Sequence, residues 1–230
     1  MTTTVVIPIK QLENAKQRLS SLLSASQRAA LFQAMVEDVL EAVTTCDRID
    51  EVLIVTDDPQ AAMVGYQYSA RVVAEPEVPG LINAVTYAGQ LLRAEGVNTM
   101  MFLPGDIPLV TVEELEVVLD GFGQGTEAAF GIVPATDLGG SNCVVCSPPD
   151  CMTFGFGEDS FRRHLQLARD SNIEPMVAKL PGIGLDVDTP ADLLELAQVL
   201  QKRALKTHTQ RFLQNSGILA NLAADLTSIG

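Results

Sequence analysis

The distribution of apolar residues along the chain restricts its fold more than any other feature. Short runs rich in valine and isoleucine recur through the 230 residues, and longer segments with helical periodicity separate them. Such runs are typical of strands that are buried on both faces, and the helical segments between them are the crossovers that parallel strands require. The sequence therefore predicts an α/β protein with a mixed, mostly parallel sheet flanked by helices.

The pattern is clear enough to place individual elements. The predicted strands cover residues 5–9, 51–56, 71–74, 99–103, 128–133, 142–147 and 175–179. The predicted helices cover residues 26–43, 81–94, 111–119 and 190–206. Ser26 is the expected N-cap of the first helix, Thr111 and Glu114 have the spacing of a capping box, and Pro190 stands in the first turn of the last helix.

The chain contains no internal repeat and no linker rich in proline or serine, so we predict a single domain over residues 1–206. Residues 207–230 are predicted to form an additional C-terminal amphipathic helix. Its apolar stripe consists of Phe212, Leu213, Ile218, Leu219, Leu222 and Leu226. The pattern fits a tail that packs on its own domain, a lid, or the contact of a homodimer.

The charge of the chain limits its partners. The formal net charge is −14, whereas a surface for nucleic acid or anionic lipid needs clustered lysine and arginine. We therefore expect a small-molecule substrate, with no nucleic-acid and no membrane partner. The sequence contains no apolar run of transmembrane length and no signal-like start, so a cytoplasmic location is expected.

Two of the four cysteines, Cys143 and Cys146, have the spacing of half a zinc site or of a redox pair. They lie within an apolar, strand-like run, and the chain has no second pair of this kind. We interpret them as small buried residues of a strand, with reduced thiols.

Cations gather directly after the first predicted strand, where Lys10 is followed by Lys16 and Arg18. In a parallel α/β sheet, ligands bind outside the carboxyl ends of the strands. A triphosphate at this edge would require such compensating charge, although solvated surface lysines are an alternative.

Three aspartates are candidate metal ligands. Asp106 follows a predicted strand and is bracketed by Pro104 and Pro108, which restrict the backbone around it. Asp186 and Asp188 are two residues apart, so in an extended segment both would point the same way. Carboxylates are good ligands for Mg²⁺, and we expect a site that includes these side chains, although each could instead form a turn or a cap.

Two glycine-containing segments carry hydroxyl groups. Residues 139–142 include Ser141, and residues 154–164 include Gly157 and Ser160, with Ser160 at the start of a predicted helix. A helix amino end favours a phosphate or a carboxylate. His164 is left outside the catalytic set, because transfer to an anionic phosphate requires no protein base. Asn83 could bind a base or ribose through its amide, or cap a helix.

Taken in order, these segments resemble the CofC family over residues 5–195. The resemblance rests on Ile7-Pro8-Ile9-Lys10, Ala15-Lys16 with Arg18-Leu19, Val55-Thr56-Asp57, Leu81-Ile82-Asn83-Ala84, Leu103-Pro104-Gly105-Asp106-Ile107-Pro108, Gly140-Ser141-Asn142, Phe156-Gly157 with Ser160-Phe161 and His164, and Leu185-Asp186-Val187-Asp188-Thr189-Pro190. Proteins of this family are the guanylyltransferases of coenzyme F420 biosynthesis. They have a single-domain, Rossmann-like fold similar to that of nucleotide-diphospho-sugar transferases.

The resemblance implies that GTP reacts with the phosphate of 2-phospho-L-lactate, phosphoenolpyruvate or a similar three-carbon acid, which yields a guanylylated product and pyrophosphate. Asp106 and Asp188 would hold Mg²⁺, and Lys10 and Lys16 would join them as catalytic residues. Ser141, Gly157 and Ser160 would bind the phospho-acid. The nucleotide would be bound by Pro8, Lys10, Lys16, Arg18, Asn83, Pro104 and Asp106.

The chain departs from the family at several places. The family usually has threonine where Ser141 stands and leucine where Ile82 stands, and residues 135–138 lack a basic residue near the expected acceptor. The tail after Lys206 lies outside the resemblance. Two other functions fit parts of the pattern: a nucleotidyltransferase for a sugar phosphate or the molybdenum cofactor, and a non-catalytic nucleotide-binding regulatory module. The first alternative usually has a glycine-rich loop with arginine directly after the first strand, and this chain has none.

Overall fold

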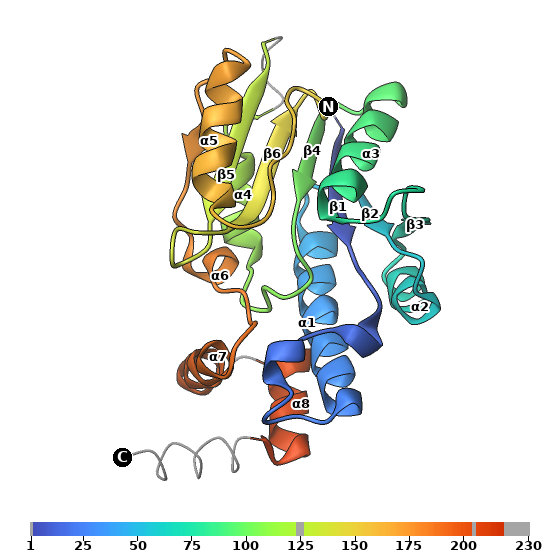
Figure 1. Ribbon diagram of the computed structural model, residues 1–230, viewed down its shortest axis with the longest axis vertical. Helices are drawn as coiled ribbons and strands as arrows, with labels where there is room; N and C mark the ends of the chain where they lie inside the picture. The colour runs from blue at the N-terminus through green and yellow to red at the C-terminus, as the bar shows by residue number, and fades with distance from the viewer. Residues whose placement is uncertain (1, 123–126, 204–205, 219–230) are drawn as a thin grey trace.

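The computed structural model describes residues 2–122, 127–203 and 206–218, and a mixed sheet forms its centre (Figure 1). The strand order across the sheet is β3-β2-β1-β4-β6-β5-β7. The strands are β1 (Thr3–Pro8), β2 (Glu51–Val55), β3 (Arg71–Val73), β4 (Thr99–Phe102), β5 (Ala129–Pro134), β6 (Ser141–Ser147) and β7 (Met176–Val177). Every predicted strand is present, and its ends lie within two residues of the predicted ones.

The direction of β6 is the topological feature that shapes the functional edge. β1, β2, β3 and β4 are parallel, and so are β5 and β7, whereas β6 is antiparallel to both β4 and β5. The first residue of β6 therefore lies at the edge where the other strands end. The predicted mixed, mostly parallel sheet is confirmed.

Helices cover both faces of this sheet, as Figure 1 shows. They are α1 (Ala25–Thr45), α2 (Pro59–Gln67), α3 (Leu81–Ala94), α4 (Val112–Leu119), α5 (Ser160–Asp170), α6 (Pro181–Gly184), α7 (Pro190–Arg203) and α8 (His208–Ser216), with 3-10 turns at Leu12–Asn14 and Gln17–Leu19. One buried cluster joins the sheet to α1, α2 and α4, and a second joins the opposite face to α3 and α5. The described part of α7 reaches Arg203, and Lys206, the predicted end of this helix, lies outside a helix.

The first turn of α1 corrects the prediction that Ser26 is its cap. Ser24 is the N-cap: its hydroxyl accepts from the Gln27 N–H, and the Gln27 side chain accepts from the Ser24 N–H. This reciprocal capping box depends on a residue three positions after the cap that can reach back, and Gln27 stands at that distance from Ser24. α1 therefore begins earlier than its apolar periodicity indicates.

The amino-terminal half of α1 extends beyond the sheet and packs against α7 and α8 in a third buried cluster. Leu213 and Ile218 are buried in this cluster, whereas Leu219, Leu222 and Leu226 of the predicted stripe lie outside the described residues. The buried Asp38 carboxylate accepts from the N–H groups of His208 and Thr209 and so caps α8. α8 thus contacts its own chain, and the boundary predicted at residue 206 stays a prediction.

Cys143 and Cys146 lie on β6 with fully buried side chains. Cys143 belongs to the cluster on one face of the sheet and Cys146 to the cluster on the other. Residues three apart in a strand point to opposite faces, so these two thiols cannot form half of one zinc site. The interpretation of both as buried strand residues is confirmed.

Within the part of the chain that the structure describes, no helix combines the length and the apolar character needed to span a bilayer.

The Glu114 carboxylate accepts from the N–H groups of Gly182 and Ile183 and so connects α4 to α6. Replacing Gly182 with alanine is expected to lower the free energy of unfolding by about 1–3 kcal/mol. The added Cβ would overlap this carboxylate and the Leu109 carbonyl. Urea unfolding measures the change. Gly139→Ala is the matched control, because the atoms nearest to a Cβ there belong to the Asp137 carboxylate and lie 3.3 Å or more away. Equal midpoints for the two variants would contradict the close packing at Gly182.

Candidate active site

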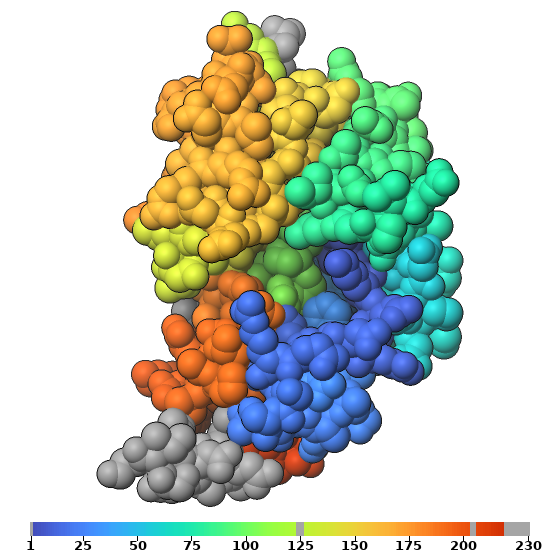
Figure 2. Space-filling model, in the orientation of Figure 1, coloured from blue at the N-terminus to red at the C-terminus, as the bar shows by residue number. Residues whose placement is uncertain are grey.

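A pocket of about 650 Å³ opens at the carboxyl edge of the sheet. Its walls come from the segment after β1, from the amino end of α3 and from the turn after β4. Figure 2 shows the surface hollowed between the blue N-terminal segment and the green α3 region. The predicted site residues that line this pocket are Pro8, Lys10, Lys16, Pro104 and Asp106.

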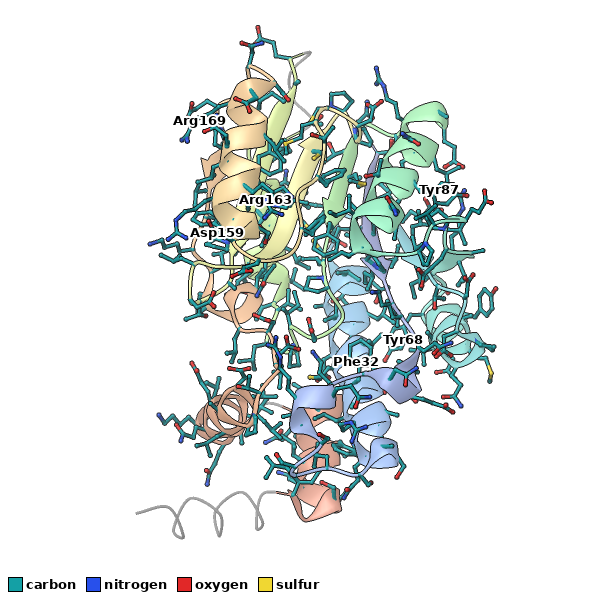
Figure 3. The ribbon with its side chains drawn as sticks, viewed as in Figure 1. Phe32, Tyr68, Tyr87, Asp159, Arg163 and Arg169 are labelled. Atoms are coloured by element: carbon teal, nitrogen blue, oxygen red, sulfur yellow. The ribbon has the colours of Figure 1, made fainter. Side chains whose placement is uncertain are left out.

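Lys16 joins two of the predicted metal ligands. Its ammonium group forms ion pairs with Asp106 and, at 2.7 Å, with Asp188, and only 5% of its side chain is exposed. Burial lowers the pKa of Lys16, but the charges of Asp106 and Asp188 outweigh this effect and the pKa lies above its ordinary value. The ammonium also lies 5.6 Å from the centre of the Phe32 ring, and Figure 3 shows Phe32 beside the N-terminal segment.

Backbone contacts hold the two carboxylates in place. The Val187 N–H donates to the Asp106 carbonyl at 3.1 Å, which binds the turn after β4 to the segment before α7. The Asp188 N–H donates to the Asp192 carboxylate at 3.0 Å, and Thr189 donates to the same oxygen. Thr189 in turn accepts from the Asp192 N–H, so the start of α7 positions Asp188.

Asp186 has a different environment from Asp188. Its carboxylate accepts from the Asn142 amide at 3.0 Å, and that amide also donates to the carbonyls of Ile183 and Gly184. Burial raises the pKa of Asp186, and the nearby charges of Asp106 and Asp188 raise it further, against the effect of Asn142. Asp186 and Asp188 thus have different partners, Asn142 and Lys16, and the expectation that their carboxylates point the same way stays a prediction.

The structure also brings together the hydroxyl groups predicted to bind the phospho-acid. The Ser160 hydroxyl donates to the Ser141 oxygen at 3.2 Å, and the His164 Nδ1 lies 2.9 Å from the same oxygen. Gly157 immediately precedes this helix and has φ of 114°, a value that L side chains rarely adopt. Its carbonyl accepts from the Ser160 N–H. Ser141 lies here because β6 runs antiparallel to its neighbours.

Arg163 holds the loop that contains Gly157. Its guanidinium donates to the carbonyls of Gly155, Phe156 and Glu158, and Figure 3 places Arg163 and Asp159 at the start of α5. Neither Arg163 nor Asn142 was assigned a role from the sequence. The contacts of Asn142 are with residues more than 40 positions away, and those of Arg163 are with the irregular loop just before its helix. For His164 a signal existed: it stands four residues after Ser160, on the same helix face.

Two predicted nucleotide-binding residues lie away from the pocket wall. Asn83 is exposed on the first turn of α3, beside the pocket-lining Leu81 and Ala84. Gly80 occupies the N-cap position of this helix. Arg18 has 75% of its side chain exposed, and its guanidinium is 3.9 Å from Asp188.

Asp106 and Asp188 fit a metal ion by their chemistry. Both carboxylates converge on a single cationic nitrogen, so their oxygens already point toward one position of positive charge. Oxygen ligands of this type suit Mg²⁺ or Mn²⁺. A second group of side chains could also hold a metal ion by the spacing of its ligand atoms. It consists of Asp38, Glu41 and His208 and lies between α1 and α8, not at the carboxyl edge of the sheet.

Acid is expected to destabilise the protein through His164. Burial lowers the pKa of His164 to about 4, the Ser160 backbone carbonyl opposes this effect, and the charge of Arg163 adds to it. Between about pH 6.5 and pH 4 the unfolded chain binds a proton that the folded chain does not, so stability falls with pH across this range, by up to about 3 kcal/mol. Urea unfolding from pH 7 to pH 4 should show a smaller fall in His164→Asn. Parallel curves for the two proteins would contradict this prediction.

Solved structures with a similar fold come from transferases that use nucleotides. A presumptive nucleotide-diphospho-sugar transferase from Desulfovibrio desulfuricans G20 superposes with a TM-score of 0.78, at 18% identity, over 96% of this chain and 99% of its own. Glucosyl-3-phosphoglycerate synthase from Mycobacterium tuberculosis, in complex with Mn²⁺ and uridine diphosphate, has a TM-score of 0.54 at 16% identity, over 87% and 79% of the two chains. The chain thus has the fold of nucleotide-diphospho-sugar transferases.

Within this class, the chain belongs to the family described as Guanylyl transferase CofC like, whose family model matches residues 3–224. The phosphoenolpyruvate guanylyltransferase of Conexibacter woesei is 35% identical over 214 residues, which are 93% of this chain and 96% of that protein. The 3-phospho-D-glycerate guanylyltransferase of Colwellia psychrerythraea is 32% identical over 197 residues, or 86% and 92% of the two proteins. The predicted family membership is confirmed, and family and fold together identify a transferase.

Proposed function

We propose that this protein transfers a guanylyl group from GTP to the phosphate of a three-carbon phospho-acid, phosphoenolpyruvate or 2-phospho-L-lactate, in coenzyme F420 biosynthesis. The observation that carries the proposal is the junction of Lys16, Asp106 and Asp188 at the pocket. Beyond the paired parts of β4 and β6, Asp106 and Ser141 lie at the same edge of the sheet. The likeness to phosphoenolpyruvate guanylyltransferases supports the choice of substrates.

The reaction is a single displacement at the α-phosphorus of GTP. An oxygen of the acceptor phosphate forms a bond to this phosphorus, the bond to the β-phosphate oxygen breaks, and pyrophosphate leaves with the electron pair. The attacking oxygen is already anionic, so no side chain has to remove a proton from it. The protein therefore acts by positioning the reactants and by compensating their charge.

The proposed nucleotide site is the pocket. Lys10 and Lys16 would face the triphosphate, with Pro8 and Pro104 in the walls; Arg18 and Asn83 would contribute from its rim. Asp106 and Asp188 would hold Mg²⁺. The ion would compensate negative charge on the phosphates when bound. Lys16 connects the metal ligands to the pocket, because its ammonium pairs with both carboxylates.

The proposed acceptor site consists of the hydroxyls of Ser141 and Ser160 together with the backbone at Gly157. Hydroxyl and N–H groups are suitable donors to a carboxylate or a phosphate. The Ser160 hydroxyl donates to Ser141, so it would contribute to this site through Ser141. Residues 135–138 provide no cation there, so recognition of the acid would depend on neutral donors.

A second acceptor, 3-phospho-D-glycerate, is favoured by the relative from Colwellia psychrerythraea. It also has three carbons, a carboxylate and a phosphate, but the two groups are separated by one additional carbon. The choice between these acceptors depends on the distance between the groups that bind the carboxylate and those that bind the phosphate.

The direct test incubates the protein with Mg²⁺, GTP and one phospho-acid at a time, and measures pyrophosphate together with the mass of the product. We expect pyrophosphate and a guanylylated product with at least one of the three acids. ATP, CTP, UTP, a sugar phosphate and the molybdenum cofactor precursor serve as competing substrates. Pyrophosphate release only with a sugar phosphate, or GTP binding without turnover of any acid, would refute the proposal.

A further inference from the structure

The buried imidazole of His164 connects the backbone of the Gly157 loop to the proposed acceptor site. The Gly155 N–H donates to Nε2 at 2.9 Å, and Nδ1 lies 2.9 Å from the Ser141 oxygen. The side chain is fully buried, and the Phe156 ring meets it edge to face at a centroid distance of 4.7 Å. Phe130 and Phe154 lie within 6.4 Å, so the orientation of the imidazole is restricted on several sides.

These contacts determine where the ring proton lies. A backbone N–H can only donate, so Nε2 must accept from Gly155 and carries no hydrogen. A neutral imidazole then has its hydrogen on Nδ1, which donates to Ser141. Burial lowers the pKa of His164 to about 4, so the neutral form predominates at neutral pH. The backbone carbonyl of Ser160, which can only accept, lies near the same ring and raises the pKa against this effect.

The hydroxyl of Ser141 is constrained as a result. Its oxygen accepts from His164 on one side and from the Ser160 hydroxyl on the other. A hydroxyl has two acceptor positions and one hydrogen, so two donors occupy both acceptor positions. The hydrogen of Ser141 must then be directed to a third partner.

We propose that His164 is a positioning residue, which orients the Ser141 hydroxyl so that it donates to the acceptor phospho-acid. This inference rests on the proposed function, because it assigns the third partner to the phospho-acid of that reaction. A fixed donor binds an anionic group without the entropy loss of ordering a free rotor. His164 does not act on the α-phosphate and transfers no proton.

Steady-state kinetics separate this role from simple packing. His164→Leu is expected to raise the KM for the phospho-acid by about tenfold or more, the effect of one hydrogen bond to an anion, while the KM for GTP changes less than about twofold. His164→Asn retains an N–H donor near the Nδ1 position and should recover most of the loss. An equal rise in both KM values would overturn the proposal.

A double-mutant cycle tests whether His164 acts through Ser141. In the Ser141→Ala background, His164→Leu should change the KM for the phospho-acid less than about twofold, because the hydroxyl it orients is absent. Equal effects of His164→Leu in both backgrounds would overturn the proposal. His208→Asn is the matched control, since it changes the other histidine of the chain, at the α1–α8 contact, and should alter neither KM.

Nitrogen NMR provides a readout that does not depend on turnover. In protein with ¹⁵N-labelled histidine, His164 should show a protonated Nδ1 and an unprotonated Nε2 at pH 7, and His208→Asn assigns the two sets of signals. Protonated Nε2 would overturn the tautomer and with it the proposal. If the tautomer is as expected but no phospho-acid binds or reacts, the proposed function fails and not the hydrogen-bond chain.

Discussion

Replacing Asp106 with asparagine is expected to lower the rate of GTP-dependent pyrophosphate release by about 100-fold to 1,000-fold. A loss of this size follows when the metal ion no longer stabilises the charge of the transition state, which costs several kcal/mol. The amide has nearly the same shape as the carboxylate but lacks its charge. It can still accept from Lys16, so the turn after β4 should keep its conformation. Initial rates measured over a range of Mg²⁺ concentrations provide the comparison with the unaltered protein.

Two further variants test whether the loss of activity in Asp106→Asn arises at the proposed metal site. Asp188→Asn should give a similar loss, since both carboxylates meet at the same cation. Asp47→Asn removes an exposed carboxylate near the end of α1 and should leave the rate unchanged. If Asp106→Asn and Asp188→Asn keep more than about a third of the activity, the two carboxylates do not form the metal site of the reaction.

Replacing Lys16 with methionine is expected to reduce both activity and stability. The methionine side chain keeps most of the volume and removes the charge. Asp106 and Asp188 then keep only the exposed Arg18 guanidinium, 3.9 Å from Asp188, as a nearby positive charge. A fully buried pair would lose about 3–5 kcal/mol, but Asp188 is 44% exposed, so we expect about 1–3 kcal/mol. Activity should fall by about 100-fold, because a charge that faces the triphosphate is lost at the same time.

Urea unfolding with and without Mg²⁺ measures the stability effect. Mg²⁺ should stabilise Lys16→Met more than the unaltered protein, because two carboxylates that have lost the lysine charge bind a divalent cation more tightly. A ligand that binds the folded state stabilises it. Lys179→Met, which removes an exposed lysine, is the matched control and should change neither property. A Lys16→Met variant with unaltered stability would contradict the ion pairs as the structure has them.

Much of the fold follows from local patterns. Each run of β-branched residues predicted as a strand lies in the sheet, and Thr111, Asp58 and Thr189 stand at helix starts as their residue types indicate. Such elements are predictable because buried strands and capped helices depend on residues close together in the sequence. Ser26 was mistaken for a cap because Ser24, two residues earlier, satisfies the same local rule and has Gln27 at the right distance.

The candidate site was predictable as a list of residues but not as an arrangement. Asp106 and Ser141 were expected at strand ends, yet the orientation of β6 relative to β4 depends on long-range pairing. Asp186 and Asp188 look equivalent by spacing, and only Asn142 and Lys16 give them different partners. His164 was left outside the catalytic set, and the sequence did not show that its imidazole would contact both Gly155 in the preceding loop and Ser141 on β6.

The sequence by itself determined the alternation of strands and helices, the excess of negative charge and the set of polar side chains that follow the strands, since these depend on neighbouring residues. The tertiary structure decided which of those side chains meet. It placed a lysine between two aspartates from separate segments, and it turned β6 around so that Ser141 joins Ser160 and His164. The physical reason is that side-chain contacts between distant segments depend on strand order, strand direction and burial, which only the folded chain defines.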